Sequence, residues 1–258
     1  MLKPYTVPPK LTTEAFAKAI QTRPDTILTS NSKLRIDGIH NVTMPAARAS
    51  VVIGGKLQVI NTCPSAGACL NLCYASSGTY LFSASMVKHT RNLQFLLDDA
   101  FGFADQLIAE IETKAKRNPK LKVRWNDSGD VFSEGYWGVM VAVMKALPHV
   151  SFYAYSKRVS FLKSKEWPAN FSVVFSMGGT EDHLIDTEKD RHAAIFSSRA
   201  ALRAAGYSDG THTDRLASNR KFRKIGLVVH GNWLAMHKLR KVAVGMEATA
   251  KRKAFKAA

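Results

Sequence analysis

The order of apolar and polar residues along the chain predicts an alternation of strands and helices. Short runs rich in β-branched and aromatic residues alternate with segments that carry apolar residues at helical spacing. We predict strands within residues 49–62, 120–126, 150–157, 171–180 and 224–232. We predict helices near residues 12–20, 83–118, 133–147, 158–167 and 190–206. Ser133 is the expected N-cap of the helix at 133–147, and Pro119 ends the helix before it.

Such an alternation predicts parallel strands joined by right-handed crossovers. The predicted fold is therefore α/β, a single-domain complete or partial (β/α) TIM-like barrel, with a doubly wound sheet as the alternative. Residues 1–48 are expected to form a lead-in and a helix packed on the barrel, and residues 49–232 the barrel core. Within that core, a hairpin or bulged strand at Gly54-Gly55 would deliver the chain to the loop at 61–75.

The residues suited to chemistry follow the predicted strands, one group after each strand. In chain order they are Cys63; then Trp125, Asn126, Asp127 and Asp130; then Tyr155, Ser156 and Lys157; then Ser176, Met177 and Gly178; and finally His230 and Asn232. Carboxyl ends of parallel strands converge on one edge, so these loops are expected to line one cavity. For any single loop of this kind the general polarity of loops is the better explanation, whereas the five loops together favour a site.

All three cysteines of the chain, Cys63, Cys69 and Cys73, lie in one loop with the spacing CX5CX3C. Structural zinc sites use four protein ligands, and here only His89 stands near enough in sequence to be a fourth. Three thiolates on a compact loop match three corners of a [4Fe-4S] cluster, leaving one iron open. The remaining interpretation is three buried or redox-reactive thiols. We predict the [4Fe-4S] cluster as the metal centre.

Other residues at the strand ends have two interpretations each. Asp127 and Asp130 are candidates for general acid and base, or for turn and capping roles. Lys157, with Arg124, either binds an anionic substrate or neutralises these carboxylates. His230 is a further catalytic candidate. Side chains that could receive a cofactor, partly by stacking, are Trp125, Asn126, Tyr155, Met177 and Gly178.

The net charge of +17 is concentrated toward the C-terminus. From Arg215 onward, the chain has twelve of its 37 Lys and Arg residues but only one acidic residue, Glu247. The segment 233–258 is therefore a candidate for nucleic-acid binding, unless it only keeps the surface soluble. No run of apolar residues is long enough for a membrane span, and no secretory signal is evident, so we expect a cytoplasmic protein.

Three motifs, "TCPSAGACLNLCYA", "VRWNDSGDVFS" and "FYAYSKR", resemble the gene product 88-like family of bacteriophage proteins. This resemblance implies a phage-encoded protein that works in the cytoplasm of the bacterial host. More distantly, a three-cysteine loop on a (β/α) barrel resembles the radical S-adenosylmethionine enzymes, which implies S-adenosylmethionine as a cofactor. Those enzymes use CX3CX2C, so the spacing here is longer.

The expected function is thus a [4Fe-4S] protein of barrel-like fold that acts as a radical-type or other redox enzyme. The alternative is a protein without catalytic activity that binds nucleic acid or a host factor and uses its metal site for structure or redox sensing. The oligomeric state and the substrate are not determined by the sequence.

Overall fold

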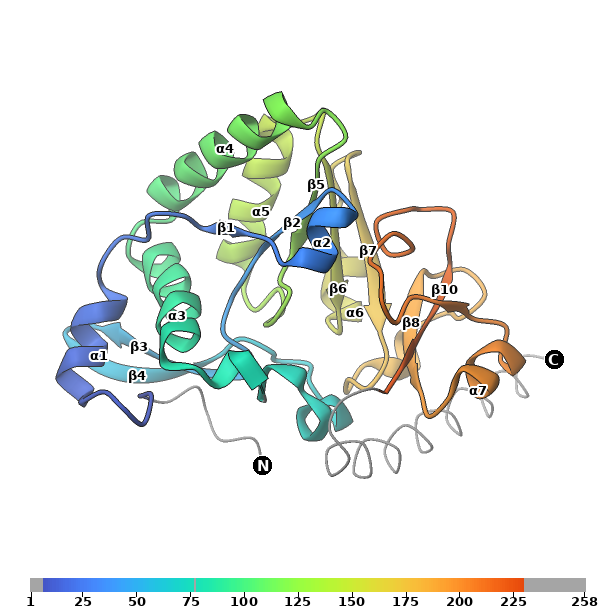
Figure 1. The fold of residues 1–258 in the computed structure, drawn as a ribbon, viewed down its shortest axis with the longest axis horizontal. Helices are drawn as coiled ribbons and strands as arrows, with labels where there is room; N and C mark the ends of the chain where they lie inside the picture. The colour runs from blue at the N-terminus through green and yellow to red at the C-terminus, as the bar shows by residue number, and fades with distance from the viewer. Residues whose placement is uncertain (1–6, 77, 230–258) are drawn as a thin grey trace.

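A mostly parallel sheet of eight strands lies at the centre of the protein (Figure 1). The computed structural model describes residues 7–76 and 78–229. The strands follow the order β1-β2-β5-β6-β7-β8-β10-β9, and β1 runs antiparallel to β2. Their bounds are β1 Leu28–Thr29, β2 Ile39–Val42, β5 Lys122–Trp125, β6 Ser151–Ser156, β7 Phe171–Ser176, β8 His192–Phe196, β9 Ser208–Asp209 and β10 Lys224–Val228.

The sheet does not close into a barrel within the described residues. There, β1 pairs with β2 at one edge and β9 pairs with β10 at the other, and the two edges are not joined. Both edge strands are two residues long, too short to form a closing ladder with each other. The prediction of a complete barrel is therefore wrong. The sheet is nevertheless wound mainly in one direction, because β2, β5, β6, β7, β8 and β10 follow one another in space.

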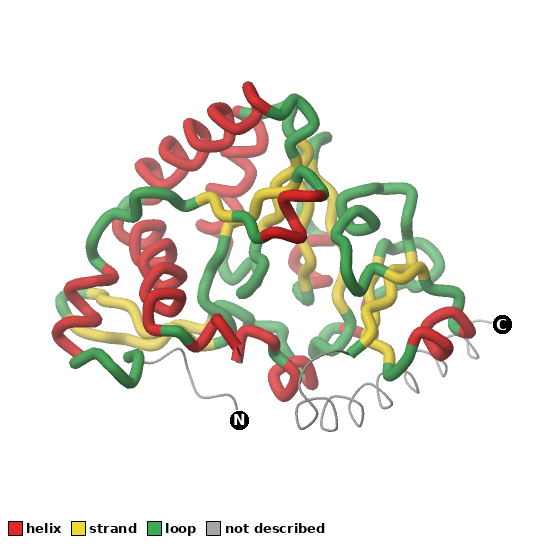
Figure 2. The backbone as a smooth tube through the Cα atoms, in the orientation of Figure 1, coloured by secondary structure: helices red, strands yellow, loops and turns green. Residues whose placement is uncertain are grey.

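The helices follow the strands as predicted in most places. Their bounds are α1 Thr13–Ile20, α2 Ser32–Ile36, α3 Ser83–Asp98, α4 Ala100–Arg117, α5 Glu134–Ala146, α6 Val159–Lys163 and α7 Arg199–Ala204, with short 3-10 turns at Ala68–Leu72, Tyr74–Ser76, Gly78–Leu81 and Asp182–Leu184. Figure 2 shows how helices and strands are distributed along the backbone. Ser133 caps α5 by accepting a hydrogen bond from the Tyr136 backbone N–H. No helix in the described part is long and apolar enough to cross a membrane.

Several boundaries differ from the prediction. The single helix expected at 83–118 is interrupted at Asp99, which caps the new helix α4. The break turns Phe101 out to solvent, where 88% of it is exposed. The segment 190–206, expected to be one helix, contains strand β8 and then the short helix α7. The segment 1–48 is more than a lead-in, because β1 and β2 belong to the main sheet.

The strand that precedes the cysteines is not part of the main sheet. Strands β3 (Arg48–Ile53) and β4 (Lys56–Asn61) form a separate antiparallel hairpin. Gly54 and Gly55 turn the chain at positive φ, which the two-residue hairpin turn requires. The predicted hairpin is confirmed. The expectation that Cys63 follows the first strand of the parallel series is wrong. The first strand of that series is β2, whereas Cys63 follows β4 of the hairpin.

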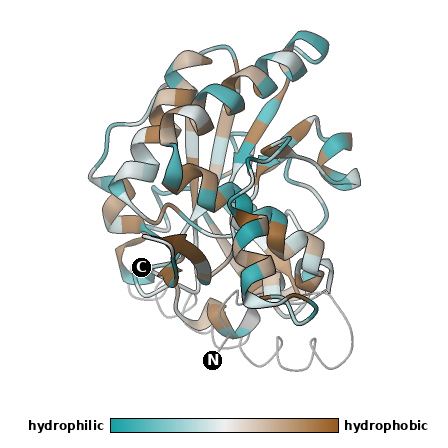
Figure 3. Cartoon of the chain, turned by 90° about the vertical axis from the view of Figure 1, so that its left-hand side faces the viewer, coloured by the Kyte–Doolittle hydropathy of each residue, from teal (hydrophilic) through white to brown (hydrophobic). Residues whose placement is uncertain are grey.

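Alternation of side chains gives the sheet two different faces. One face packs against α3, α4 and α5 in the large apolar core, in which Trp125, Phe152 and Phe175 are almost fully buried. These helices carry hydrophobic and hydrophilic positions side by side (Figure 3), as helices that cover a sheet do. The other face carries a small apolar cluster and is covered by α2 and the loop around Ala217. Toward the carboxyl ends of the strands this second face carries polar side chains, such as Arg124 and Ser176, beside apolar ones, such as Leu227.

The cysteine loop is docked onto the strand-end loop that follows β7, mainly through backbone atoms. The N–H groups of Gly67 and Cys69 donate to the carbonyl of Gly178 over 3.2 and 3.0 Å. In return, the N–H of Thr180 donates to the Ser65 carbonyl over 2.9 Å. This arrangement requires the two backbone segments to lie close together, because a Cβ atom on Gly179 would lie only 2.8 Å from the Ser65 carbonyl oxygen.

A second set of contacts fixes the start of the loop. Thr62 donates through its N–H to Ala47 and through its hydroxyl to Pro45. The N–H of Asp130, beyond β5, donates to the carbonyl of Thr62 over 2.8 Å. The loop is therefore held by the segments that follow β2, β5 and β7.

We predict that Gly179→Ala destabilises the protein by about 1–3 kcal/mol, because the new methyl group overlaps the Ser65 carbonyl and Lys157. Urea unfolding measures the change. The same variant should increase the rate at which a thiol reagent labels the cysteines.

Gly138→Ala is the matched control. Gly138 lies exposed in the middle of α5, and a Cβ there would meet no atom within 4 Å. Alanine should stabilise the helix by about 1 kcal/mol and leave the labelling rate unchanged. Equal unfolding free energies for Gly179→Ala and the native protein would contradict the docking described above.

Candidate functional site

A cavity of about 470 Å³ opens at the carboxyl ends of the parallel strands. Its floor is the second face of the sheet, represented by Arg124, Tyr155, Ser176, Ile195 and Leu227. Arg124 pairs with Tyr153, Tyr155 with Val174 and Ser176 with Ala193, so each floor residue lies two positions beyond its neighbour's partner, and Ile195 pairs directly with Leu227. Because residues two apart share a face, all five point to the same side. The walls come from the cysteine loop, from α2 and from the loop at 210–214. The volume is that of a small-molecule site.

All three cysteines line this cavity, together with Ala66 and Leu70 of the same loop. Each thiol is partly buried and none forms a disulfide. The Ala47 N–H donates to the sulfur of Cys63 over 3.3 Å. Burial, with Asp130 nearby, raises the pKa of Cys63 to about 12. Burial also raises the pKa of Cys73, although backbone N–H groups of the next turn lower it in part.

Lys157 brings a positive charge to the cysteines. Its ammonium group donates to Ser176 Oγ over 2.7 Å, which fixes it on the cavity floor. From there its charge lowers the pKa of both Cys63 and Cys73, against the larger effect of burial. The predicted residue Lys157 therefore lies in the site, where its ammonium group is held by Ser176.

Asp130 connects two of the loops that form the site. One carboxylate oxygen accepts from the Ser156 hydroxyl over 2.6 Å and from the Val131 N–H, and the other accepts from the Lys157 N–H. Burial raises the pKa of Asp130, and these hydrogen bonds oppose that shift. A carboxylate with both oxygens engaged organises the two loops that follow β5 and β6. The capping interpretation fits its contacts better than the acid–base one.

Arg124 is neutralised by a residue that the sequence did not single out. Its guanidinium donates to Asp214 over 2.8 Å, and the Tyr153 hydroxyl donates to the same oxygen. Burial alone would lower the pKa of Arg124, but the ion pair raises it well above its usual value. The guanidinium also lies 5.0 Å from the ring centre of Tyr155, a cation–π contact. Tyr155 is thus held in place as part of the cavity floor.

Asn126 and Asp127 follow β5 directly and belong to the cavity lining. Asn126 adopts a left-handed backbone with φ of 55°, which asparagine tolerates better than most residues. Its Oδ1 accepts a hydrogen bond from the Tyr136 hydroxyl over 2.7 Å. Asp127 accepts a hydrogen bond from Tyr80, and burial raises the pKa of its carboxyl group while Arg124 opposes the shift. Asp127 is therefore the better placed of the two acid–base candidates.

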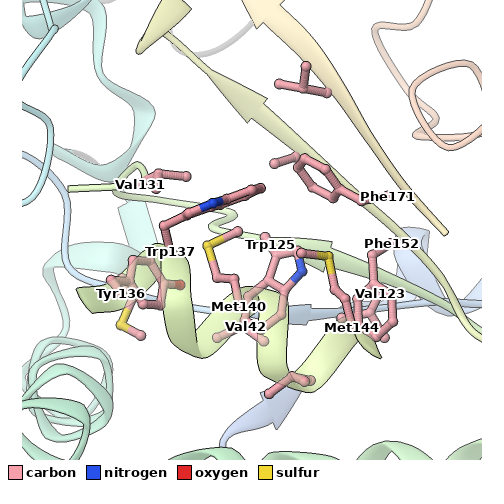
Figure 4. Close-up of a cluster of buried hydrophobic side chains, with 14 of the residues drawn as sticks. Val42, Val123, Trp125, Val131, Tyr136, Trp137, Met140, Met144, Phe152 and Phe171 are labelled. Carbon is pink, nitrogen blue, oxygen red and sulfur yellow. The ribbon is translucent and has the colours of Figure 1, made fainter. Parts of the chain in front are cut away.

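Other predicted cofactor residues lie outside the cavity lining. Trp125 is fully buried on the helix-covered face, where it stacks on Phe152 with a ring separation of 5.9 Å (Figure 4). Alternation along β5 explains this, because the preceding residue, Arg124, takes the cavity side. Met177 is a core residue as well. Gly178 does not line the cavity, but its carbonyl anchors the cysteine loop.

The two histidine candidates have different outcomes. His89 lies in α3 with its ring 5.4 Å from that of Tyr80, and it is not part of the cavity lining. Burial lowers its pKa to about 4, so its imidazole is neutral at physiological pH. His230, Asn232 and the basic segment 233–258 lie outside the described residues.

Two aspartates were missed by the sequence interpretation. Asp214 pairs with Arg124, and Asp37 accepts hydrogen bonds from Thr213, Asp214 and Arg215. Both line the cavity. The polar run "GTHTD" before β10 was the available signal for Asp214. It was not recognised because it precedes a strand, whereas the predicted site residues were sought after strands.

The arrangement offers thiol donors, a nearby ammonium group and a buried carboxyl group in one cavity. Thiolates are the preferred protein ligands of iron–sulfur clusters and of zinc. Within the described residues, no group of three or more His, Cys, Asp or Glu side chains is arranged to hold a metal ion. The features of this cavity that suit a metal centre are the thiol donors and their setting.

A comparison with family models matches residues 16–254 to the family described as Gene product 88. Searches of curated proteins and of solved structures returned no significant match. The resemblance to radical S-adenosylmethionine enzymes receives no support from these comparisons. The family match spans most of the chain, including the hairpin, the cysteine loop and every strand of the cavity floor. This chain belongs to the gene product 88 family.

Proposed function

We propose that Cys63, Cys69 and Cys73 bind an iron–sulfur cluster of the [4Fe-4S] type, and that the protein is a redox enzyme acting on a small ligand in the adjoining cavity. The observation that carries the proposal is the gathering of every cysteine of the chain on one cavity at the carboxyl ends of parallel strands. When bound, such a cluster supplies one-electron transfer and an iron with an open position.

The setting of the thiols suits metal ligands better than nucleophiles. Reactive cysteines have lowered pKa values, whereas burial raises those of Cys63 and Cys73. A metal displaces such protons outright. Backbone N–H groups that point at sulfur, as Ala47 does at Cys63, are among the groups that tune iron–sulfur centres.

The remaining cavity residues have separate roles in this proposal. Lys157 offsets the negative charge of the thiolates from its position on Ser176. Asp130 keeps the loops after β5 and β6 together. Asp127, whose burial favours the protonated form, is the group that would hold or release a proton next to a bound ligand. S-adenosylmethionine is not part of this proposal.

Protein purified without oxygen should be brown and contain about four iron and four sulfide ions per chain. Cys63→Ser, Cys69→Ser and Cys73→Ser should each lose most of the iron, because each removes one of three protein ligands. Elemental analysis and visible absorption measure the loss, and circular dichroism checks that the variants are folded.

Ala68→Ser is the control within the same loop. Ala68 is exposed and does not line the cavity, so this variant should keep its full iron content. Colourless, iron-free native protein from an oxygen-free preparation would rule out the cluster, and zinc in its place would assign the thiols to a different metal centre.

Lys157→Met should make the cluster harder to reduce, moving its reduction potential to a more negative value. The reason is that an ammonium group close to the thiolates stabilises the more negative, reduced form. The backbone N–H that binds Asp130 is unchanged in this variant. A redox titration followed by electron paramagnetic resonance gives the potential.

Lys122→Met is the matched control, because Lys122 also donates to a serine hydroxyl, that of Ser218, but from the other end of β5. Its cluster should have the native potential. Identical shifts in the two variants would show that Lys157 acts only through the overall charge.

A further inference from the structure

Basic side chains gather at the amino-terminal edge of the parallel strands, opposite the cavity. Residues 113–122 lead from the end of α4 into β5 (Figure 1), and residues 215–224 lead into β10. Together these two stretches carry ten Lys and Arg residues and no Asp or Glu. Their charge is felt within the protein, because burial lowers the pKa of His40 in β2 and the positive charges of Lys114 and Arg35 lower it further. Like charges repel, so this edge is suited to an anionic partner.

The stretch 215–224 runs across the first residues of three strands, which brings the two basic stretches together. Three hydrogen bonds hold it there: Lys122 Nζ to Ser218 Oγ at 3.1 Å, Arg220 Nη2 to the Phe171 carbonyl at 2.7 Å, and the His192 N–H to the Arg223 carbonyl at 2.8 Å. Lys122, Phe171 and His192 begin β5, β7 and β8. The basic residues therefore follow the edge of the sheet from β5 to β8.

The backbone of this stretch is held inward, so that its basic side chains reach solvent. The guanidinium of Arg191 donates to four of its carbonyl groups, those of Leu216, Ala217, Asn219 and Phe222. The ring of Phe222 packs against the small apolar cluster on the second face of the sheet. Lys221 and Arg223, on either side of it, are exposed.

Five exposed cations along this edge have no acidic partner, and we call them the basic rim: Lys116, Arg117, Lys120, Lys221 and Arg223. In the part of the chain that the structure describes, none of the five forms an ion pair. The dipole of α4 favours cations in its last turn, which accounts in part for Lys116 and Arg117. Lys120, Lys221 and Arg223 lie outside the helices, so the dipole does not explain them.

We propose that the basic rim binds the phosphate backbone of a double-stranded nucleic acid. Neighbouring strands lie about 4.8 Å apart, so the edge from β5 to β8 is about 14 Å long. Phosphates follow one another about every 3.4 Å along each strand of a duplex, so the rim spans about four of them. Proteins that bind single strands add aromatic side chains for stacking on the bases, and the only aromatic residue of the two stretches, Phe222, is packed inward.

This surface is independent of the cysteine cavity, which lies at the other ends of the strands. It also differs from the basic segment 233–258, because its charges belong to the described residues. A duplex held through its backbone alone is bound without regard to sequence, and the binding weakens steeply as salt is added.

The test measures the fluorescence anisotropy of a labelled duplex DNA of about 20 base pairs, titrated with the full-length protein at several salt concentrations. Lys116→Gln/Lys120→Gln/Lys221→Gln removes three charges of the rim. We expect its affinity to be at least about tenfold lower at low salt, and the slope of log K against log salt to be shallower by about three, because each phosphate contact contributes about 0.9. Titration of duplex RNA shows which nucleic acid is preferred, and rim-dependent binding of either supports the proposal.

Lys10→Gln/Lys18→Gln/Lys56→Gln is the matched control, because it removes three exposed lysines that lie outside the rim. It should bind the duplex with nearly native affinity and slope. Circular dichroism and the iron content should match those of the native protein in both triple variants. The proposal is overturned if the native protein binds no duplex, if the rim variant binds as tightly as the native protein, or if both triple variants lose affinity equally. Tighter rim-dependent binding to vesicles of anionic lipid than to either duplex would assign the rim to a membrane surface instead.

Discussion

The docking of the cysteine loop onto the strand-end loops is the constraint on which the site depends. The hairpin β3–β4 carries the chain away from the main sheet, so nothing in the sheet ladder itself fixes the cysteines. They are positioned instead by the bridge between Ala66 and Gly179 and by the hydrogen bonds around Gly178. Two glycines, Gly67 and Gly179, allow the two backbones to approach each other. A Cβ atom on either would lie 3.0 Å or less from a backbone atom of the other segment.

The second determinant is the difference between the two faces of the sheet. Because the helices cover one face, large apolar residues such as Trp125 and Phe152 are used there for packing. The opposite face carries Arg124 and Tyr155 toward the carboxyl ends, and a short helix and a loop leave space above them. Buried charge on that face is balanced locally, Arg124 by Asp214 and the carboxylate of Asp130 by hydrogen-bond donors. The cavity consequently contains charged groups in a largely apolar lining, while the protein keeps an ordinary apolar core.

Much of this architecture could be predicted from the sequence. Periodicity placed β5, β6, β7 and β10 and the capped helix α5, because these segments are long and strongly patterned. The two-residue strands β1 and β9 carry too few residues for a periodic signal, and without them the open edges of the sheet could not be foreseen. For the site, strand-end position identified Asn126, Asp127 and Lys157. It misplaced Trp125, because the face of a residue depends on a register that only the folded sheet defines.

The anchors of the cysteine loop are mostly main-chain atoms, as at Gly67, Cys69 and Thr180. Almost every amino acid supplies a backbone carbonyl and an N–H group. The path of this segment therefore depends little on which residues occupy its outward positions. Exposed positions such as Pro64 and Ala68 can therefore be exchanged during evolution without moving the thiols. The outer surface of the loop can thus change in sequence while the thiols keep their positions at the cavity.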